Sequence, residues 1–160
     1  MLITLEPWEY EHAHNTGIRR YTANWNKQNA PHYKTERMED DRTAQAAAAI
    51  CELAVAKATN RYWSGHVWTA QDHNKYRNIP DVGHNIEVRR VRTGNTVAIR
   101  KHQTGKNLII FAAQPQPPEF TQIDIWGWLQ YDKAWELAQP SDYSPETTRL
   151  LHRKHLITEW

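Results

Sequence analysis

The chain has 160 residues, 39% of them hydrophobic, which is enough for a single domain whose core needs no disulfide or metal staple. Its single cysteine excludes an intrachain disulfide framework and a cysteine-based zinc finger, and no apolar run approaches the roughly 20 residues of a membrane span. A net charge of +2 does not by itself indicate a nucleic-acid partner. Because residues 1–7 lack a basic start and a long apolar run, we expect no signal peptide and a cytoplasmic protein without a membrane partner.

The N-terminal part of the chain is predicted to be helical. We expect a first helix over residues 7–20 and a loop over residues 22–34, where the sequence has no clear period. A second helix is predicted over residues 41–59, with acidic residues at its start, where the helix dipole favours them. Between Ala46 and Ala58 it is apolar on nearly every side, which is typical of a buried helix.

The rest of the chain is predicted to contain mostly strands. The candidates, each bounded by turn residues, are residues 61–68, 86–92, 96–102, 107–113 and 120–128. Tight turns are expected to join the middle three into an antiparallel meander. The continuously apolar run 108–113 predicts a central strand covered on both faces. With a short final helix over 131–138, this order predicts an α+β (mixed α/β) domain in which helices flank the meander.

The aromatic composition is unusual, with 8 Trp and 7 Tyr but only 2 Phe. Most of the tryptophans fall on predicted elements, where they would pack a small sheet. Trp8, Trp25 and Trp160 fall outside the predicted core and are candidates for an interface, either with a protein partner or in a homodimer. Trp126 and Trp128 flank Gly127 in one predicted strand, so we expect both rings on the same face.

Charge is unevenly distributed along the chain. Basic residues dominate positions 87–106, whereas acidic residues dominate positions 119–146. A basic strip is typical of a phosphate-binding surface and favours DNA as a partner. Two solvated faces that balance each other would give the same pattern, and both interpretations remain open.

Three acidic residues are candidates for a catalytic site. Glu52 lies on the second helix, Asp81 precedes the strand 86–92, and Glu87 lies in that strand, on the same face as Arg89. Converging carboxylates raise one another's pKa unless a cation lies between them, and hard oxygen ligands suit Mg²⁺ or Mn²⁺. Each residue also has a structural explanation. Glu52 would belong to a narrow polar stripe on its helix, Asp81 would be an ordinary turn residue, and Glu87 would form a surface ion pair with Arg89.

The order of these residues resembles the PD-(D/E)XK nuclease superfamily, which includes restriction endonucleases, λ-type exonucleases and junction resolvases. The resemblance rests on Pro80-Asp81, followed by Glu87-Val88-Arg89 on a strand after a glutamate-bearing helix. It covers roughly residues 44–130, and with Gly127-Trp128 it is similar to small phage-encoded members. It implies a restriction-endonuclease-like core over about 44–138 and an N-terminal helical segment, 1–40, in one domain of residues 1–160.

The resemblance also implies roles for individual residues. Asp81, Glu87 and the Val88 carbonyl would bind Mg²⁺ or Mn²⁺, and Glu52 would bind the metal directly or through water. Arg89 stands where the family has lysine; it keeps the positive charge but cannot act as a base. Lys101, on the adjacent predicted strand, is a candidate for the missing ammonium.

The function implied by the resemblance is metal-dependent hydrolysis of DNA phosphodiester bonds, by an endonuclease or an exonuclease. The alternative is a catalytically inactive module of the same fold, which would bind nucleic acid or a phage or host protein. Arginine in place of the family's lysine favours the alternative.

Overall fold

The computed structural model describes residues 1–24, 40–69, 72–76 and 78–160. The chain folds as an α+β domain, as predicted from the order of its elements. The helices and strands, in chain order, are β1 (Leu2–Thr4), α1 (Pro7–Asn24), α2 (Asp41–Thr59), α3 (His73–Tyr76), β2 (Ile86–Arg90), β3 (Thr96–Arg100), β4 (Ile109–Pro115), β5 (Gln122–Gln130), α4 (Tyr131–Leu137), β6 (Gln139–Pro140) and β7 (Thr148–His152). None of the helices in the described part of the chain combines the length and the apolarity needed to cross a bilayer.

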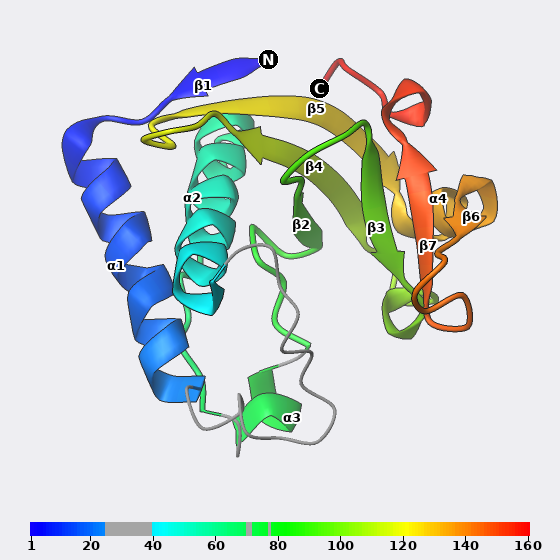
Figure 1. The fold of residues 1–160 in the computed structure, drawn as a ribbon, viewed down its shortest axis with the longest axis horizontal. Coiled ribbons are helices and arrows are strands. Elements are labelled where there is room, and N and C mark those ends of the chain that lie inside the picture. Colours follow the sequence, from blue (N-terminus) through cyan, green and yellow to red (C-terminus); the bar gives the residue numbers. More distant parts are fainter. Residues whose placement is uncertain (25–39, 70–71, 77) are drawn as a thin grey trace.

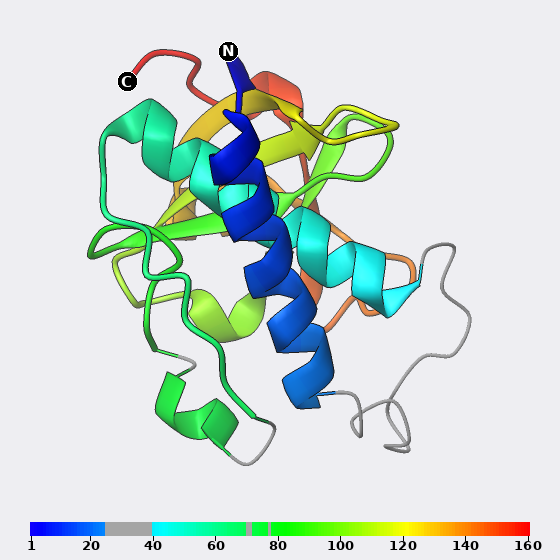
Figure 2. The same cartoon turned by 90° about the vertical axis from the view of Figure 1, so that its left-hand side faces the viewer.

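The elements form layers around one four-stranded sheet with the strand order β1-β5-β4-β2. Helix α2 packs on one face of this sheet and α1 packs on α2 (Figure 1). The other face is covered by α4 and by a smaller sheet with the order β3-β7-β6. Seen from the helical side, α1 and α2 cross in front of the sheet (Figure 2). Two separate hydrophobic clusters therefore fill the core, one on each face of the main sheet.

Helix α2 begins and ends where the sequence predicts. The side chain of Asp40 accepts a hydrogen bond from the Thr43 amide at the N-terminus, and Asn60 adopts the left-handed conformation that commonly ends a helix. Nine of its residues are buried, which confirms the prediction of a buried helix. Glu52 is one of the nine, and a buried carboxylate needs a partner within the protein.

Helix α1 extends four residues beyond its predicted end at Arg20. The side chain of Asn24 stabilises this last turn by donating hydrogen bonds to the carbonyl oxygens of Arg20 and Trp68. The rest of the predicted loop 22–34, with Trp25, lies outside the described residues. Trp8 is 68% exposed, in keeping with its predicted place outside the core.

Helices α1 and α2 approach closely at Gly17, where an added Cβ would overlap the backbone of Gln45 and Ala46. We expect Gly17→Ala to lower the free energy of unfolding by about 1–3 kcal/mol, because overpacking outweighs the better helix propensity of alanine. Urea denaturation would measure the change, with Asn15→Ala at an exposed position of α1 as the matched control. Equal stability of the two variants would contradict the close packing of these helices.

Strand β4 is the central strand that the apolar run predicts, between β5 and β2. Its side chains alternate between the two cores: Phe111 and Ala113 pack on the α2 side, whereas Ile110 and Ala112 pack on the side of the smaller sheet. The prediction that both faces are covered is therefore confirmed.

The hairpin predicted between the strands 86–92 and 96–102 is wrong. Strand β2 pairs with β4 in parallel, and β3 joins the other sheet by pairing with β7. The reason lies in burial, because Ile86 and Val88 pack against the α2 side, whereas Val97 and Ile99 belong to the opposite core. The turn after β2 thus moves the chain from one sheet to the other. The hairpin predicted between 96–102 and 107–113 is wrong as well, because β3 and β4 lie in different sheets. No two strands of the predicted meander therefore pair in antiparallel orientation.

Two further strand predictions are also wrong. Residues 61–68 do not form a strand but make one isolated bridge, from Trp63 to Val82. In β5 the ladder register moves from Gly127 directly to Ile125, so Trp126 is the extra residue of a β-bulge. The bulge reverses the alternation, and the rings of Trp126 and Trp128 consequently pack into opposite cores.

Candidate functional site

The spacing between Asp81 and Glu87 is produced by a small turn before β2. Val82 and Ile86 exchange both backbone hydrogen bonds, and Gly83 allows the reversal with a φ of 58°. In this antiparallel register residue 81 lies opposite residue 87, so the side chains of Asp81 and Glu87 share one face. The six-residue spacing seen in the sequence therefore brings the two carboxylates together.

Asp81 lies at the free edge of β2. Its Oδ2 accepts a hydrogen bond of 2.8 Å from the amide of Val88, a residue whose backbone groups point away from β4. The pKa of Asp81 is raised well above its usual value, first by burial and then by the negative charges of Glu52 and Glu87. The charges of Glu52 and Glu87 thus act on Asp81 in addition to its burial.

Glu87 and Arg89 share one face of β2, as expected, but they meet through a third residue. Gln103, in the turn after β3, donates a hydrogen bond of 2.7 Å to Glu87 Oε2 and accepts one from Arg89. The side-chain Oε1 of Gln103 also accepts a 3.0 Å hydrogen bond from the hydroxyl of Tyr131. Burial raises the pKa of Glu87, although Arg89 and Gln103 act in the opposite direction. This arrangement is a buried network rather than an exposed surface ion pair.

Glu52 is held by an arginine of α1. Arg20 binds both carboxylate oxygens, at 2.7 and 3.0 Å, and the two side chains are only 4% and 8% exposed. The indole of Trp63 donates a further hydrogen bond to Glu52 Oε2. Arg20 in turn donates to the His66 carbonyl oxygen, and its guanidinium lies over the ring of Trp68. Glu52 therefore has a complete set of partners in this structure.

A solvent-open cavity of about 410 Å³ lies beside these acids. Asp81, Glu87, Arg89 and Gln103 form one part of its lining. The remainder comes from two histidines, of which His102 is exposed, and from aromatic and apolar side chains: His66, His102, Trp68, Tyr76 and Ile79. The Nε of Arg89 is buried and, among the described residues, finds no hydrogen-bond partner. The Nε atoms of Arg90 and Arg149 share this property, so the feature that distinguishes Arg89 is its place in the lining of the cavity.

The carboxylates suit a divalent cation by their chemistry, although they are not gathered into a metal-binding cluster. Across the described residues, no three His, Cys, Asp or Glu side chains lie close enough together to hold a metal ion. Asp81 and Glu87 nevertheless offer hard oxygen ligands on one face, and the pKa of Asp81 is raised first by burial and then by the charges of Glu52 and Glu87. With the Val88 carbonyl they form the predicted ligand set, whereas Glu52 could bind a metal only if Arg20 released one of its oxygens.

The two predicted cations have different positions. Arg89 lines the cavity, whereas the side chain of Lys101 is exposed and is absent from the lining. Another lysine, Lys106, lies within electrostatic range of Glu87 and lowers its pKa. A catalytic role for Lys101 therefore has no support from its position.

Sequence reasoning missed Arg20, Gln103 and Tyr131. For Arg20 a signal exists, because it continues a stripe of small residues, Ala13, Thr16 and Gly17, along the helix face that packs on α2. An arginine on such a face predicts a buried acidic partner. Gln103 and Tyr131 carry no comparable signal, because their roles depend on contacts between separate elements.

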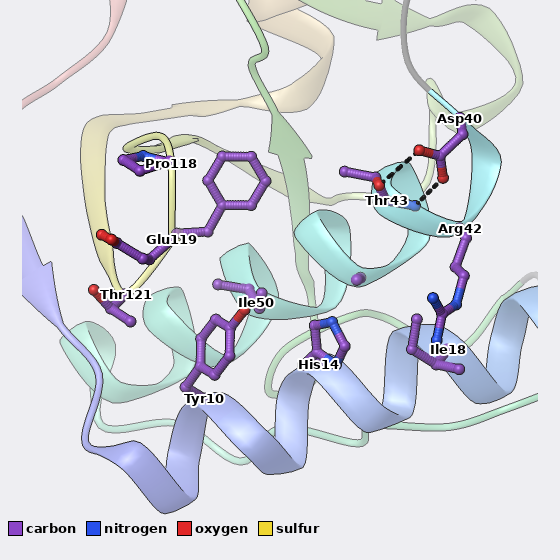
Figure 3. A pocket seen from close by; sticks show the side chains of 12 residues that line it. Tyr10, His14, Ile18, Asp40, Arg42, Thr43, Ile50, Pro118, Glu119 and Thr121 are labelled. Carbon is purple, nitrogen blue, oxygen red and sulfur yellow. Dashed lines mark hydrogen bonds between the residues drawn. The ribbon is translucent and has the colours of Figure 1, made fainter.

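A separate cavity, of about 500 Å³, lies between α1, the start of α2 and the turn before β5 (Figure 3). Tyr10 and His14 stack on each other at its side, with Ile50 at its base and Glu119 at its rim. None of the predicted site residues lines it. The candidate catalytic residues therefore lie away from this cavity.

The raised pKa of Asp81 predicts how stability depends on pH. The folded protein binds a proton at Asp81 more tightly than the unfolded chain, so this stabilisation is complete at low pH and is lost as the pH rises through the raised pKa. Without divalent metal, Asp81→Asn should therefore stabilise the fold at pH 7, and the gain should vanish below about pH 4. Urea denaturation at several pH values would measure it, with exposed Asp142→Asn as the control. A gain independent of pH would contradict the predicted titration.

The chain was also compared with known proteins. No model of a protein family, no curated protein and no solved structure matches it.

Proposed function

We propose that this protein is a metal-dependent nuclease that hydrolyses phosphodiester bonds of DNA. The observation that carries the proposal is the pairing of Asp81 with Glu87 on one face of an open cavity that the guanidinium of Arg89 also lines. The paired carboxylates suit a divalent metal ion, and the fixed cation beside them suits the phosphate group on which that metal would act. The resemblance of the sequence to the PD-(D/E)XK superfamily supports the same conclusion.

Each residue of the cavity has a chemical task in this proposal. Asp81, Glu87 and the Val88 carbonyl would hold Mg²⁺ or Mn²⁺, which when bound lowers the pKa of a water molecule and polarises a phosphoryl oxygen. Arg89 donates hydrogen bonds to the phosphate and stabilises its developing negative charge. Gln103 fixes the positions of Glu87 and Arg89 relative to each other, and Tyr131 in turn fixes Gln103.

The proposal is tested by incubating the purified chain with DNA in the presence of Mg²⁺, Mn²⁺ or a chelator. Cleavage should require one of the two metals and should stop when the chelator is added. Cleavage that persists in the chelator would overturn the metal-dependent mechanism.

One observation favours a second function, that of a catalytically inactive module with the same fold. The Arg20 guanidinium already neutralises Glu52, so the chain supplies its own cation beside the acids. Calorimetry with Mn²⁺ near neutral pH separates the two functions, because the inactive module would bind no metal. DNA affinity that falls steeply with salt would then distinguish a nucleic-acid module from one that binds a protein.

A further inference from the structure

The candidate site is open on two sides. A second cavity, also of about 410 Å³, shares Glu87 and Gln103 with the cavity that contains Asp81 and Arg89. Because Gln103 donates its 2.7 Å hydrogen bond to Glu87, this bonded pair forms the boundary between the two cavities. A ligand bound at Glu87 can therefore extend in two directions, and both cavities open to solvent.

Each side offers positive charge to a chain of phosphates. Arg89 lines the first cavity, and Lys106 lines the second, together with His84 and Asn78. The Lys106 Nζ is positioned by a 3.3 Å hydrogen bond to Asn78 Oδ1. Glu87 lines both cavities, so it shares the first with Arg89 and the second with Lys106. Phosphates on either side of a bond held at Glu87 would thus each meet a cation.

We infer that the protein cleaves internal phosphodiester bonds, as an endonuclease, an inference that rests on the proposed nuclease function. A site specialised for chain ends needs a wall or a terminal-phosphate pocket on one side of the acids. Here the Glu87–Gln103 pair has an open, cation-bearing cavity on each side. The polynucleotide passes across the pair, with one neighbouring phosphate at Arg89 and the other at Lys106.

Covalently closed circles test the inference, because they have no ends. Single-stranded and double-stranded circular DNA, each beside its linear form of the same sequence, would be incubated with the full chain and Mn²⁺. We expect circles to be cut at a rate similar to that of the linear forms. Degradation of linear DNA with intact circles would overturn the inference but leave the nuclease proposal standing, whereas cleavage of neither form would overturn both.

A lysine variant tests the second cavity separately. Lys106→Ala should lower kcat/KM on circular DNA about tenfold, mainly through a higher KM, as is typical for loss of one charge-assisted phosphate contact. Lys133→Ala is the matched control, because this exposed lysine on α4 lines neither cavity. Unchanged KM in Lys106→Ala would overturn the path across the second cavity.

Discussion

Glu87→Gln is expected to abolish Mg²⁺-dependent DNA cleavage, with a loss of at least about 100-fold in kcat. The substitution removes the negative charge needed to hold a dication, yet the amide keeps the size of the side chain and can still bond to Gln103. Asp81→Asn should have an effect of the same order, because the two carboxyl groups share one face of the cavity. Cleavage of a labelled oligonucleotide under single-turnover conditions measures both losses.

The control for this prediction is a carboxylate outside the site. Glu136 is exposed on α4 and lines neither of the two cavities, so Glu136→Gln should cleave like the unaltered chain. Thermal unfolding of all three variants would establish that they are folded. Retention of full activity in both Glu87→Gln and Asp81→Asn would eliminate these residues as metal ligands.

Arg20→Met is expected to destabilise the fold by about 3–5 kcal/mol. Glu52 would remain buried at the interface of α1 and α2 without a cation, and the unpaired charge carries the full desolvation cost. The variant also loses the contacts of Arg20 with the His66 carbonyl and the Trp68 ring, which hold the segment 61–69 over the acids. Urea denaturation at pH 7 measures the change in the free energy of unfolding.

Two further variants separate charge from packing. Arg19→Met is the matched control, because this neighbouring arginine is exposed and its replacement should change stability by less than about 0.5 kcal/mol. The double variant Arg20→Met/Glu52→Leu removes both charges, so it should recover much of the stability lost in Arg20→Met. A double variant as unstable as Arg20→Met would mean that packing, rather than the buried charge, dominates at this position.

The sequence predicts well those structural features that depend on residues close together along the chain. The bounds of α2 follow from its capping residues and its alanine-rich run, and the central place of β4 follows from its unbroken apolar stretch. The pairing of Asp81 with Glu87 is local too, because it depends on a turn at Gly83, but the sequence predicts only the two acids as candidates and not the turn that pairs them.

Short-range sequence patterns do not predict which strands pair or which residue neutralises a buried charge. A turn such as 93–95 has the composition of a hairpin, but burial of Ile86 and Val97 in opposite cores decides which strand pairs with which. The partner of Glu52 is 32 residues away on another helix; the stripe of small residues marks Arg20 as buried, but only the fold decides which acid it meets.

The sequence by itself determined the α+β class and the buried helix that carries Glu52, because the order of the elements and short-range periodicity specify them. Only the tertiary structure decided that β2 and β4 are parallel, that Arg20 neutralises Glu52, and that Gln103 and Tyr131 complete the site around Glu87. These features arise when distant elements bury polar groups against one another. A buried charge or hydrogen-bonding group must then be satisfied by whichever side chain the fold brings within reach.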